Sequence, residues 1–99
     1  MKIIKLEQTP KEFTIKGFTL TEGEYVFEIS NNGVDHPVGF GLSPKSHPDL
    51  EHAMAMVTNG GKGLNDGESD KTEVITLNKG KYVYWCPANP TEQYEIVVE

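Results

Sequence analysis

The amino-acid sequence predicts an all-β protein that folds as a sandwich of two β-sheets. Short runs of alternating apolar and polar residues follow one another along the chain, as expected for half-buried strands. Turn signals rich in Gly, Asn and Pro separate these runs at Thr21-Glu22-Gly23, Asn31-Asn32-Gly33, Asn78-Lys79-Gly80 and Asn89-Pro90. A chain of 99 residues is long enough for one thin core, so we assign residues 1–99 to one domain. Regular short strands over about a hundred residues are typical of an antiparallel sandwich.

Seven or eight strands follow from the positions of the alternating apolar residues. The runs cover residues 3–6, 13–20, 25–30, 38–42, 74–77, 82–86 and 94–98. Gly17 lies inside the second run, where a glycine permits a bulge or kink, and this divides that run in two. The clearest alternation is in the third run, where Tyr25, Phe27 and Ile29 share one face.

One segment breaks the β pattern and predicts a short helical insert around residues 48–57. Its residues are good helix formers, and Pro48 suits the first position of a helix. Three apolar residues share one helical face at positions i, i+4 and i+7: Leu50, Met54 and Val57. We therefore expect one of Met54 and Met56 to pack against the sheet together with Leu50.

The charge and composition of the chain exclude several classes of function. Fifteen Asp and Glu residues face nine Lys and no Arg, for a net charge of −6, so we expect no nucleic-acid binding. No apolar run reaches the roughly 18 residues needed to cross a membrane. The sequence contains no Ser-His-Asp order with supporting motifs, no HExxH and no phosphate-binding glycine loop, and we predict that the protein is not an enzyme.

Cys86 and His36 are the side chains best placed to bind a metal ion. Cys86 is the only cysteine, which excludes an internal disulfide and zinc sites with several thiolates. Each of the two residues follows a predicted strand, and strand ends of a sandwich can meet at one pole, so a thiolate and an imidazole fifty residues apart can come together. Sulfur with imidazole favours copper or zinc over magnesium or calcium. The plainer alternatives are a buried, inert thiol and a turn imidazole that bonds to the backbone.

Three segments of the chain resemble the cupredoxins, the blue-copper domains related to plastocyanin and azurin. They are the strand and loop 23–36, the turn 64–69, and the strand and loop 80–90, which has the pattern Gly-x-Tyr-x-Tyr-x-Cys-Pro. The similarity runs from about Phe13 to Val98 and implies a Greek-key sandwich of cupredoxin type. It also implies that copper is the cofactor, with His36 as its first imidazole ligand and Cys86 as its thiolate ligand.

The resemblance further implies where the protein works and with what. It would be a periplasmic or otherwise exported electron-transfer protein, with a redox partner such as a cytochrome or an oxidase. The start of the chain, Met1-Lys2-Ile3-Ile4-Lys5, has no long apolar segment, so an exported form would have lost its leader. A cytoplasmic location fits the lone cysteine equally well.

The loop after Cys86 departs from the cupredoxin pattern. It contains no second His and no Met, and Gln93 is the best-placed residue for an axial ligand. His47, His52 and Met54 of the predicted insert would complete the site if the insert folds over the pole.

Three functions follow from these residues. The first is a copper-binding protein for electron transfer or copper handling, with His36, Cys86 and one further ligand. The second is a cupredoxin fold without metal that acts as a binding module. The third is a Cu(I) carrier that uses soft ligands of the insert together with the thiolate: Met54, Met56, His52 and Cys86.

Overall fold

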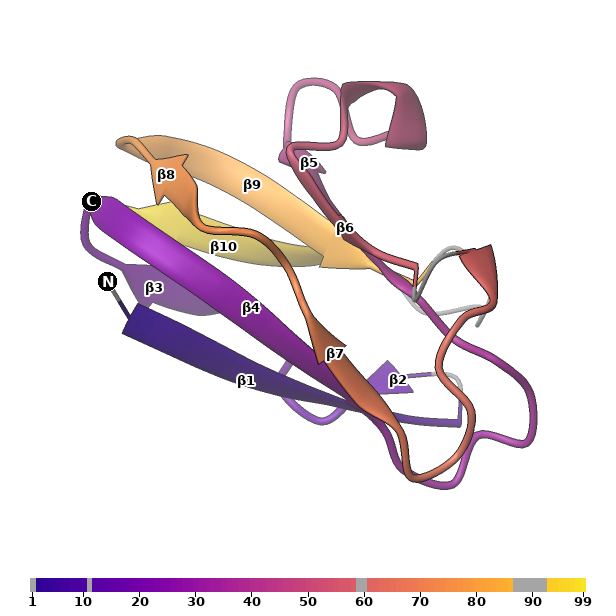
Figure 1. Ribbon diagram of the computed structural model, residues 1–99. Coiled ribbons are helices and arrows are strands. Elements are labelled where there is room, and N and C mark those ends of the chain that lie inside the picture. Colours follow the sequence, from indigo (N-terminus) through magenta and orange to yellow (C-terminus); the bar gives the residue numbers. More distant parts are fainter. Residues whose placement is uncertain (1, 11, 59–60, 87–92) are drawn as a thin grey trace.

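The computed structural model describes residues 2–10, 12–58, 61–86 and 93–99, which form two β-sheets packed face to face (Figure 1). The elements of this part of the chain are, in order, β1 (Lys2–Thr9), β2 (Glu12–Phe13), β3 (Phe18–Leu20), β4 (Gly23–Asn31), β5 (Phe40–Pro44), the 3-10 helix η1 (Leu50–His52), β6 (Ala55–Val57), β7 (Ser69–Lys71), β8 (Ile75–Leu77), β9 (Gly80–Trp85) and β10 (Tyr94–Val98). The predicted all-β sandwich is confirmed. Short additional strands, β6 and β7 among them, raise the number of strands above the seven or eight expected.

Among the described residues, each sheet contains five strands. The first has the order β2-β1-β4-β7, with β8 also paired to β4, and the second has the order β3-β10-β9-β5-β6. Two pairs, β1 with β4 and β3 with β10, run parallel, whereas the sequence predicted an antiparallel sandwich. Parallel neighbours need a long connection, and here the chain passes through β2 and β3 before it returns beside β1 as β4.

The insert at residues 48–57 is helical only in part. A 3-10 helix covers Leu50–His52, and Ala55–Val57 then forms the edge strand β6, antiparallel to β5. Strand alternation buries Ala55 and Val57, while Met54 and Met56 are 39% and 43% exposed. The expectation that one methionine packs against the sheet is therefore wrong, because strand pairing with β5 and the burial of Ala55 and Val57 outweigh the local helix propensity of these residues.

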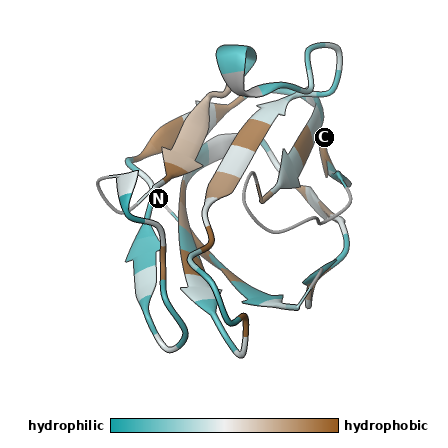
Figure 2. Cartoon of the chain, turned by 90° about the vertical axis from the view of Figure 1, so that its right-hand side faces the viewer, coloured by the Kyte–Doolittle hydropathy of each residue, from teal (hydrophilic) through white to brown (hydrophobic). Residues whose placement is uncertain are grey.

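Aromatic rings from both sheets fill the core. The ring of Phe13 meets those of Tyr84 and Tyr94 edge-on, with centroids 5.2 Å and 6.0 Å away, and Phe27 stacks on Phe40 at 5.7 Å. Figure 2 shows the resulting pattern, in which hydrophobic and hydrophilic segments alternate along the strands. Such ring pairs contribute about 0.5–1.5 kcal/mol each beyond simple burial, and they make the sandwich a rigid support for the loops at its ends.

The hydroxyl of Tyr84 fixes the connection between β2 and β3. It donates a hydrogen bond to the carbonyl oxygen of Ile15 and accepts one from the Gly17 N–H at 3.0 Å. Burial raises the pKa of Tyr84 to about 12.

No helix in the described part of the chain is long and apolar enough to cross a membrane.

Candidate functional site

Cys86 lies at one end of the sandwich, directly after β9. Its side chain is buried, with 4% of its surface exposed. Strand β5 runs antiparallel beside β9 with Gly41 opposite Trp85, so the residues just before β5 lie next to Cys86. The N–H of Gly39 donates to the Cys86 Sγ at 3.4 Å. We call Cys86, Gly39 and the segment 31–38 that precedes it the Cys86 pole.

Asn31 holds the segment that carries His36. Its side chain is 2% exposed, and its Nδ2 donates to the carbonyl oxygens of Val34 at 3.3 Å, His36 at 3.3 Å and Leu64 at 2.9 Å. Its Oδ1 accepts the Val34 N–H at 2.9 Å. A backbone bridge between Val38 and Leu64 closes the same loop from its far end. The polypeptide around His36 is thus fixed by buried hydrogen bonds.

The imidazole of His36 is exposed on this fixed segment. Its Nδ1 lies 3.0 Å from the carbonyl oxygen of Pro37. If Nδ1 carries the ring proton and donates it to that oxygen, the lone pair is at Nε2, which is how the histidine ligands of metals are commonly oriented. The side chain of Val38, which lies between Pro37 and Gly39 in the sequence, is fully buried and apolar, so it cannot act as a metal ligand.

Gln93 points away from the interior of the pole. Its Nε2 donates to the carbonyl oxygen of Pro48 at 2.9 Å, and its side chain is exposed, whereas the neighbouring Tyr94 is buried in the core. Alternation along the chain therefore places Gln93 on the outer face of the sheet. The rest of the loop expected to hold ligands after Cys86, residues 87–92, lies outside the described residues.

The remaining predicted ligands lie elsewhere. The insert begins after Pro44, which pairs with Tyr82 in the register of β5 and β9. Tyr82 is four residues before Cys86, a distance of about 13 Å along a strand. The backbone of His47, whose N–H donates to the carbonyl oxygen of Pro44 at 3.0 Å, therefore starts about this far along the sheet from Cys86, and the insert then crosses back to Gln93 at Pro48.

Met54 follows the 3-10 helix η1 and lies on a different part of the surface. Its side chain and that of Met56 line a cleft of about 270 Å³ between β6 and the strands β7 and β8. The other residues around this cleft are Ala55, Lys71, Glu73 and Ile75. Met54 is thus a surface residue at the open edges of the two sheets.

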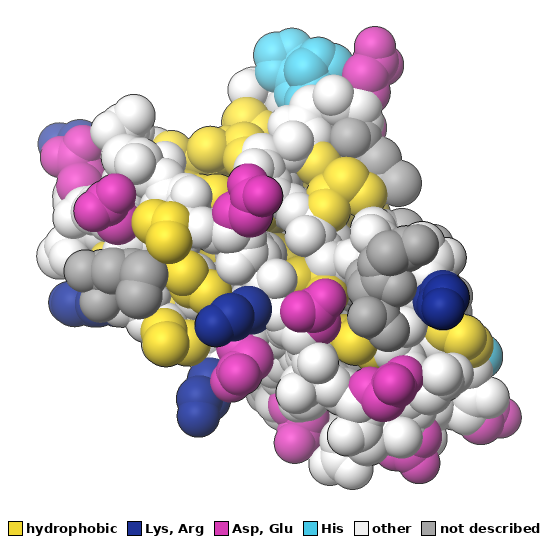
Figure 3. Space-filling model, viewed as in Figure 1, with side chains coloured by type: hydrophobic (Ala, Val, Ile, Leu, Met, Phe, Trp, Pro, Cys, Tyr) yellow, Lys and Arg dark blue, Asp and Glu magenta, His cyan; other side chains and the backbone are white. Residues whose placement is uncertain are grey.

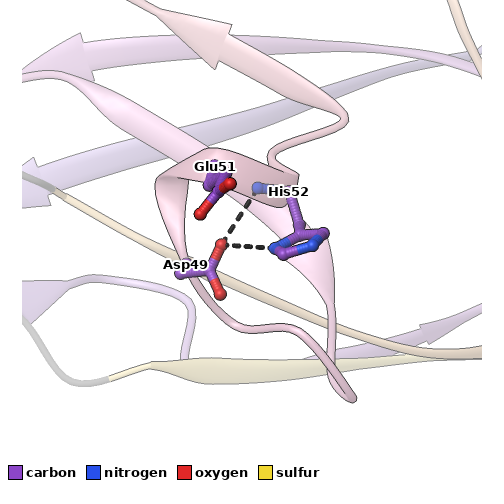
Figure 4. A group of neighbouring side chains, drawn as sticks. All are labelled: Asp49, Glu51 and His52. Carbon is purple, nitrogen blue, oxygen red and sulfur yellow. Dashed lines mark hydrogen bonds and ion pairs between the residues drawn. The ribbon is translucent and has the colours of Figure 1, made fainter.

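The insert brings together side chains of its own. Asp49 Oδ1 lies 2.7 Å from His52 Nδ1 and also accepts the backbone N–H of His52 at 3.0 Å (Figure 4). One potential ligand atom from each of Asp49, Glu51 and His52 lies within 4.8 Å of the others. The ring of His47 is 4.5 Å from that of His52. The hydrogen bond from His52 lowers the pKa of Asp49 below its ordinary value.

We call residues 45–52 the insert turn. Among the residues that the structure describes, it holds the one group of three His, Cys, Asp or Glu side chains close enough to share a metal ion. Figure 3 shows histidine and acidic side chains together on this projecting turn. The sequence predicted His47 and His52 as ligands but missed Asp49 and Glu51. Their signal was the dense run of such residues around Pro48.

Solved structures of blue-copper proteins share this fold. Auracyanin B matches with a TM-score of 0.77 and 16% identity, over 99% of this chain and 88% of that one. Auracyanin A, a blue copper protein from the green thermophilic photosynthetic bacterium Chloroflexus aurantiacus, matches with a TM-score of 0.72 and 17% identity, over 98% of each chain. A dithionite-reduced auracyanin from the photosynthetic bacterium Roseiflexus castenholzii matches with a TM-score of 0.71 and 16% identity, over 98% of this chain and 96% of that one.

These similarities establish the fold. No protein-family model matches the chain, and no curated protein sequence matches it. The cupredoxin fold that the sequence resemblance implied is thereby confirmed.

The side chains at the pole do not fit a blue-copper centre. Such a centre needs two imidazoles and one thiolate around the ion, with a weak axial ligand. The chain has three histidines, and two of them, His47 and His52, belong to the insert turn. The pole therefore offers one thiolate, Cys86, and one imidazole, His36.

Proposed function

We propose that this protein has a copper-handling function and binds Cu(I) through the Cys86 thiolate and the His36 imidazole. The observation that carries the proposal is the hydrogen bond from the Gly39 N–H to Cys86 Sγ, which ties the segment bearing His36 to the sulfur. Gly39 is three residues after His36, so the backbone of His36 lies within about 14 Å of the thiol. We propose no catalytic activity.

The available ligand types favour Cu(I) binding over a blue-copper centre that transfers electrons reversibly. Soft thiolates select Cu(I), whereas the trigonal blue-copper geometry needs the second imidazole that the pole lacks. The hydrogen bond from Gly39 fixes the position of the sulfur, which binds metal as a thiolate. The buried Asn31 network holds the loop in place before the ion arrives, and this lowers the ordering cost of binding.

A competition titration with Cu(I) and a chromophoric chelator, carried out without oxygen, tests the proposal. We expect one Cu(I) per chain and loss of binding in Cys86→Ser. In His36→Gln we expect the Cu(I) affinity to fall by about tenfold or more. His47→Gln is the matched control because it removes an exposed imidazole from the insert turn, and we expect it to change nothing. Unchanged Cu(I) affinity in Cys86→Ser would overturn the proposal.

Addition of Cu(II) separates copper handling from electron transfer. We expect no intense thiolate-to-copper absorption band. A band that disappears in Cys86→Ser would instead indicate a blue-copper electron carrier, and the net charge of −6 would then suit a basic partner such as a cytochrome. The periplasmic or otherwise exported location belongs to the same proposal, and cell fractionation tests it.

A metal-free binding module is the second candidate function. The cleft of about 270 Å³ beside the exposed Met54 and Met56 favours it, since exposed apolar side chains at sheet edges are suited to contact with a partner. Failure to bind copper in either oxidation state would leave this function as the better explanation of the fold.

A further inference from the structure

We propose that the insert turn is a separate binding site for a divalent transition-metal ion of the Zn²⁺ type. Its ligands are Asp49, Glu51 and His52, and the neighbouring His47 would join them after a rotation of its exposed side chain. This site uses nitrogen and oxygen ligands only, and it does not depend on copper binding at the Cys86 pole.

The three central side chains already have the spacing that one ion requires. Ligand atoms bound to a zinc ion lie about 2.0–2.2 Å from the metal, and therefore about 3–4 Å from one another. One ligand atom from each of Asp49, Glu51 and His52 lies within 4.8 Å of the others. The 2.7 Å hydrogen bond between Asp49 Oδ1 and His52 Nδ1 shows that these two atoms approach closely, and an ion would replace the hydrogen between them.

A second imidazole, that of His47, lies beside this group of three side chains. The ring of His47 is 4.5 Å from the ring of His52, with 36° between their planes. The Nδ1 of His47 is 3.2 Å from Ser46 Oγ, so Nε2 is the nitrogen that would bind the ion. Two imidazoles with carboxylates favour zinc, copper or nickel over magnesium or calcium, which prefer oxygen ligands alone.

Strands below the insert turn hold its backbone from several sides. Ser43 Oγ in β5 donates to the carbonyl oxygen of Asp49 at 2.8 Å, and Gln93 Nε2 donates to that of Pro48 at 2.9 Å. The Lys45 ammonium forms an ion pair with the Glu95 carboxylate of β10. Because the backbone is fixed in this way, a metal ion has mainly to order exposed side chains.

Calorimetric titration with Zn²⁺ of the Cys86→Ser chain tests this site without the thiolate. We expect one Zn²⁺ per chain, and about tenfold or greater loss of affinity in His52→Gln and in Glu51→Gln. The matched control is His36→Gln, because it removes the one histidine that lies outside the insert turn, and we expect unchanged Zn²⁺ affinity. Far-UV circular dichroism verifies that each variant is folded.

The ring nitrogens give a second readout in the same Cys86→Ser chain, where no thiolate competes for Zn²⁺. On addition of Zn²⁺, we expect the ¹⁵N resonances of His47 and His52 to shift together, and those of His36 to remain unchanged at one equivalent. Unchanged affinity in His52→Gln, or an equal loss in His36→Gln, would overturn the proposal. Binding no tighter than millimolar would also overturn it. If Cys86→Ser does not fold, the same titrations in a Cys86→Ala chain, which also lacks the thiolate, decide.

Discussion

The Cys86 pole and the insert turn carry the potential metal ligands of this protein, and they differ in how those ligands are held. At the pole, the Cys86 sulfur and the Asn31 amide that fixes the neighbouring loop are 4% and 2% exposed. In the insert turn, the imidazoles and carboxylates are exposed and are fixed mainly through the backbone beneath them. The thiol thus lies buried, whereas the nitrogen and oxygen ligands, His36 of the pole included, are exposed to solvent.

The comparison also shows that closeness along the chain does not decide which residues share a site. His47 is eleven residues from His36, and Cys86 is fifty residues away. Antiparallel pairing of β5 with β9 nevertheless brings the segment of His36 to Cys86 and starts the insert turn, with His47, farther along the sheet.

We expect the largest effect on stability from removal of the Asn31 side-chain amide, which holds the loop of the Cys86 pole. Asn31→Ala removes donors to three carbonyl oxygens and the acceptor for the Val34 N–H, in a place that water does not reach. We expect about 3 kcal/mol lower free energy of unfolding by urea denaturation. Asn32→Ala, at the exposed neighbouring position, is the control, and we expect a change within about 0.5 kcal/mol. Equal effects of the two would show that the pole is not held by this network.

A substitution at Gly63 perturbs the pole from the side of His36. A Cβ at this residue would lie 2.6 Å from Pro37 Cβ and 3.2 Å from the Val38 carbonyl oxygen, and its φ is +74°. We expect Gly63→Ala to cost about 2–3 kcal/mol in thermal or urea unfolding, and to weaken Cu(I) binding because Pro37 adjoins His36.

Gly61→Ala is the matched control for that experiment. Gly61 also has a positive φ, +88°, but an added Cβ would have open space around it. We expect a cost of about 1 kcal/mol and unchanged Cu(I) affinity. If the two variants behave alike, the contact with Pro37 does not position the loop.

An imidazole placed at residue 93 tests whether a side chain at this position can reach a copper ion at the Cys86 pole. Gln93 lies on the outer face of the sheet and bonds to the insert at Pro48, so Gln93→His should create no thiolate-to-copper band with Cu(II). Loss of the exposed hydrogen bond should lower the free energy of unfolding by about 0.5–1 kcal/mol. Visible absorption measures the first effect, and the appearance of a strong band would place residue 93 at the pole instead.

The smallest expected effect concerns the pKa of the Asp49 carboxyl group in the insert turn. The hydrogen bond from His52 lowers the pKa of Asp49, so the interaction stabilises the fold above the ordinary pKa and is lost as the pH falls through the lowered value. Titration of the carboxyl ¹³C resonance should show this low pKa in the native chain. His52→Gln should raise the pKa toward 3.8, and His47→Gln should raise it less, since its charge is the weakest contributor. Equal shifts in the two variants would contradict the hydrogen-bond assignment.

Much of the framework could be predicted from the sequence. Alternation of apolar residues marked β4, β5, β9 and β10, because the side-chain period of a strand is a local property. The positions of Cys86 and His36 after strand ends also gave a local reason to expect them at a pole. That the two side chains bind one ion remains a prediction.

Other features depended on contacts between distant segments. Residues 55–57 have helix-forming neighbours, yet they form β6 because the edge of β5 offers hydrogen-bond partners and burial for Ala55 and Val57. The side chain of Gln93 bonds to Pro48, 45 residues away in the sequence. Neither contact leaves a local pattern.

By itself, the sequence determined the fold class and the sparse set of soft and imidazole ligands, because periodicity and residue identity are written along the chain. Only the tertiary structure decided how those ligands are divided. The register of β5 against β9 places Gly39 beside Cys86 and starts the insert turn about four residues farther along the sheet, and a register is fixed by packing across the whole sandwich.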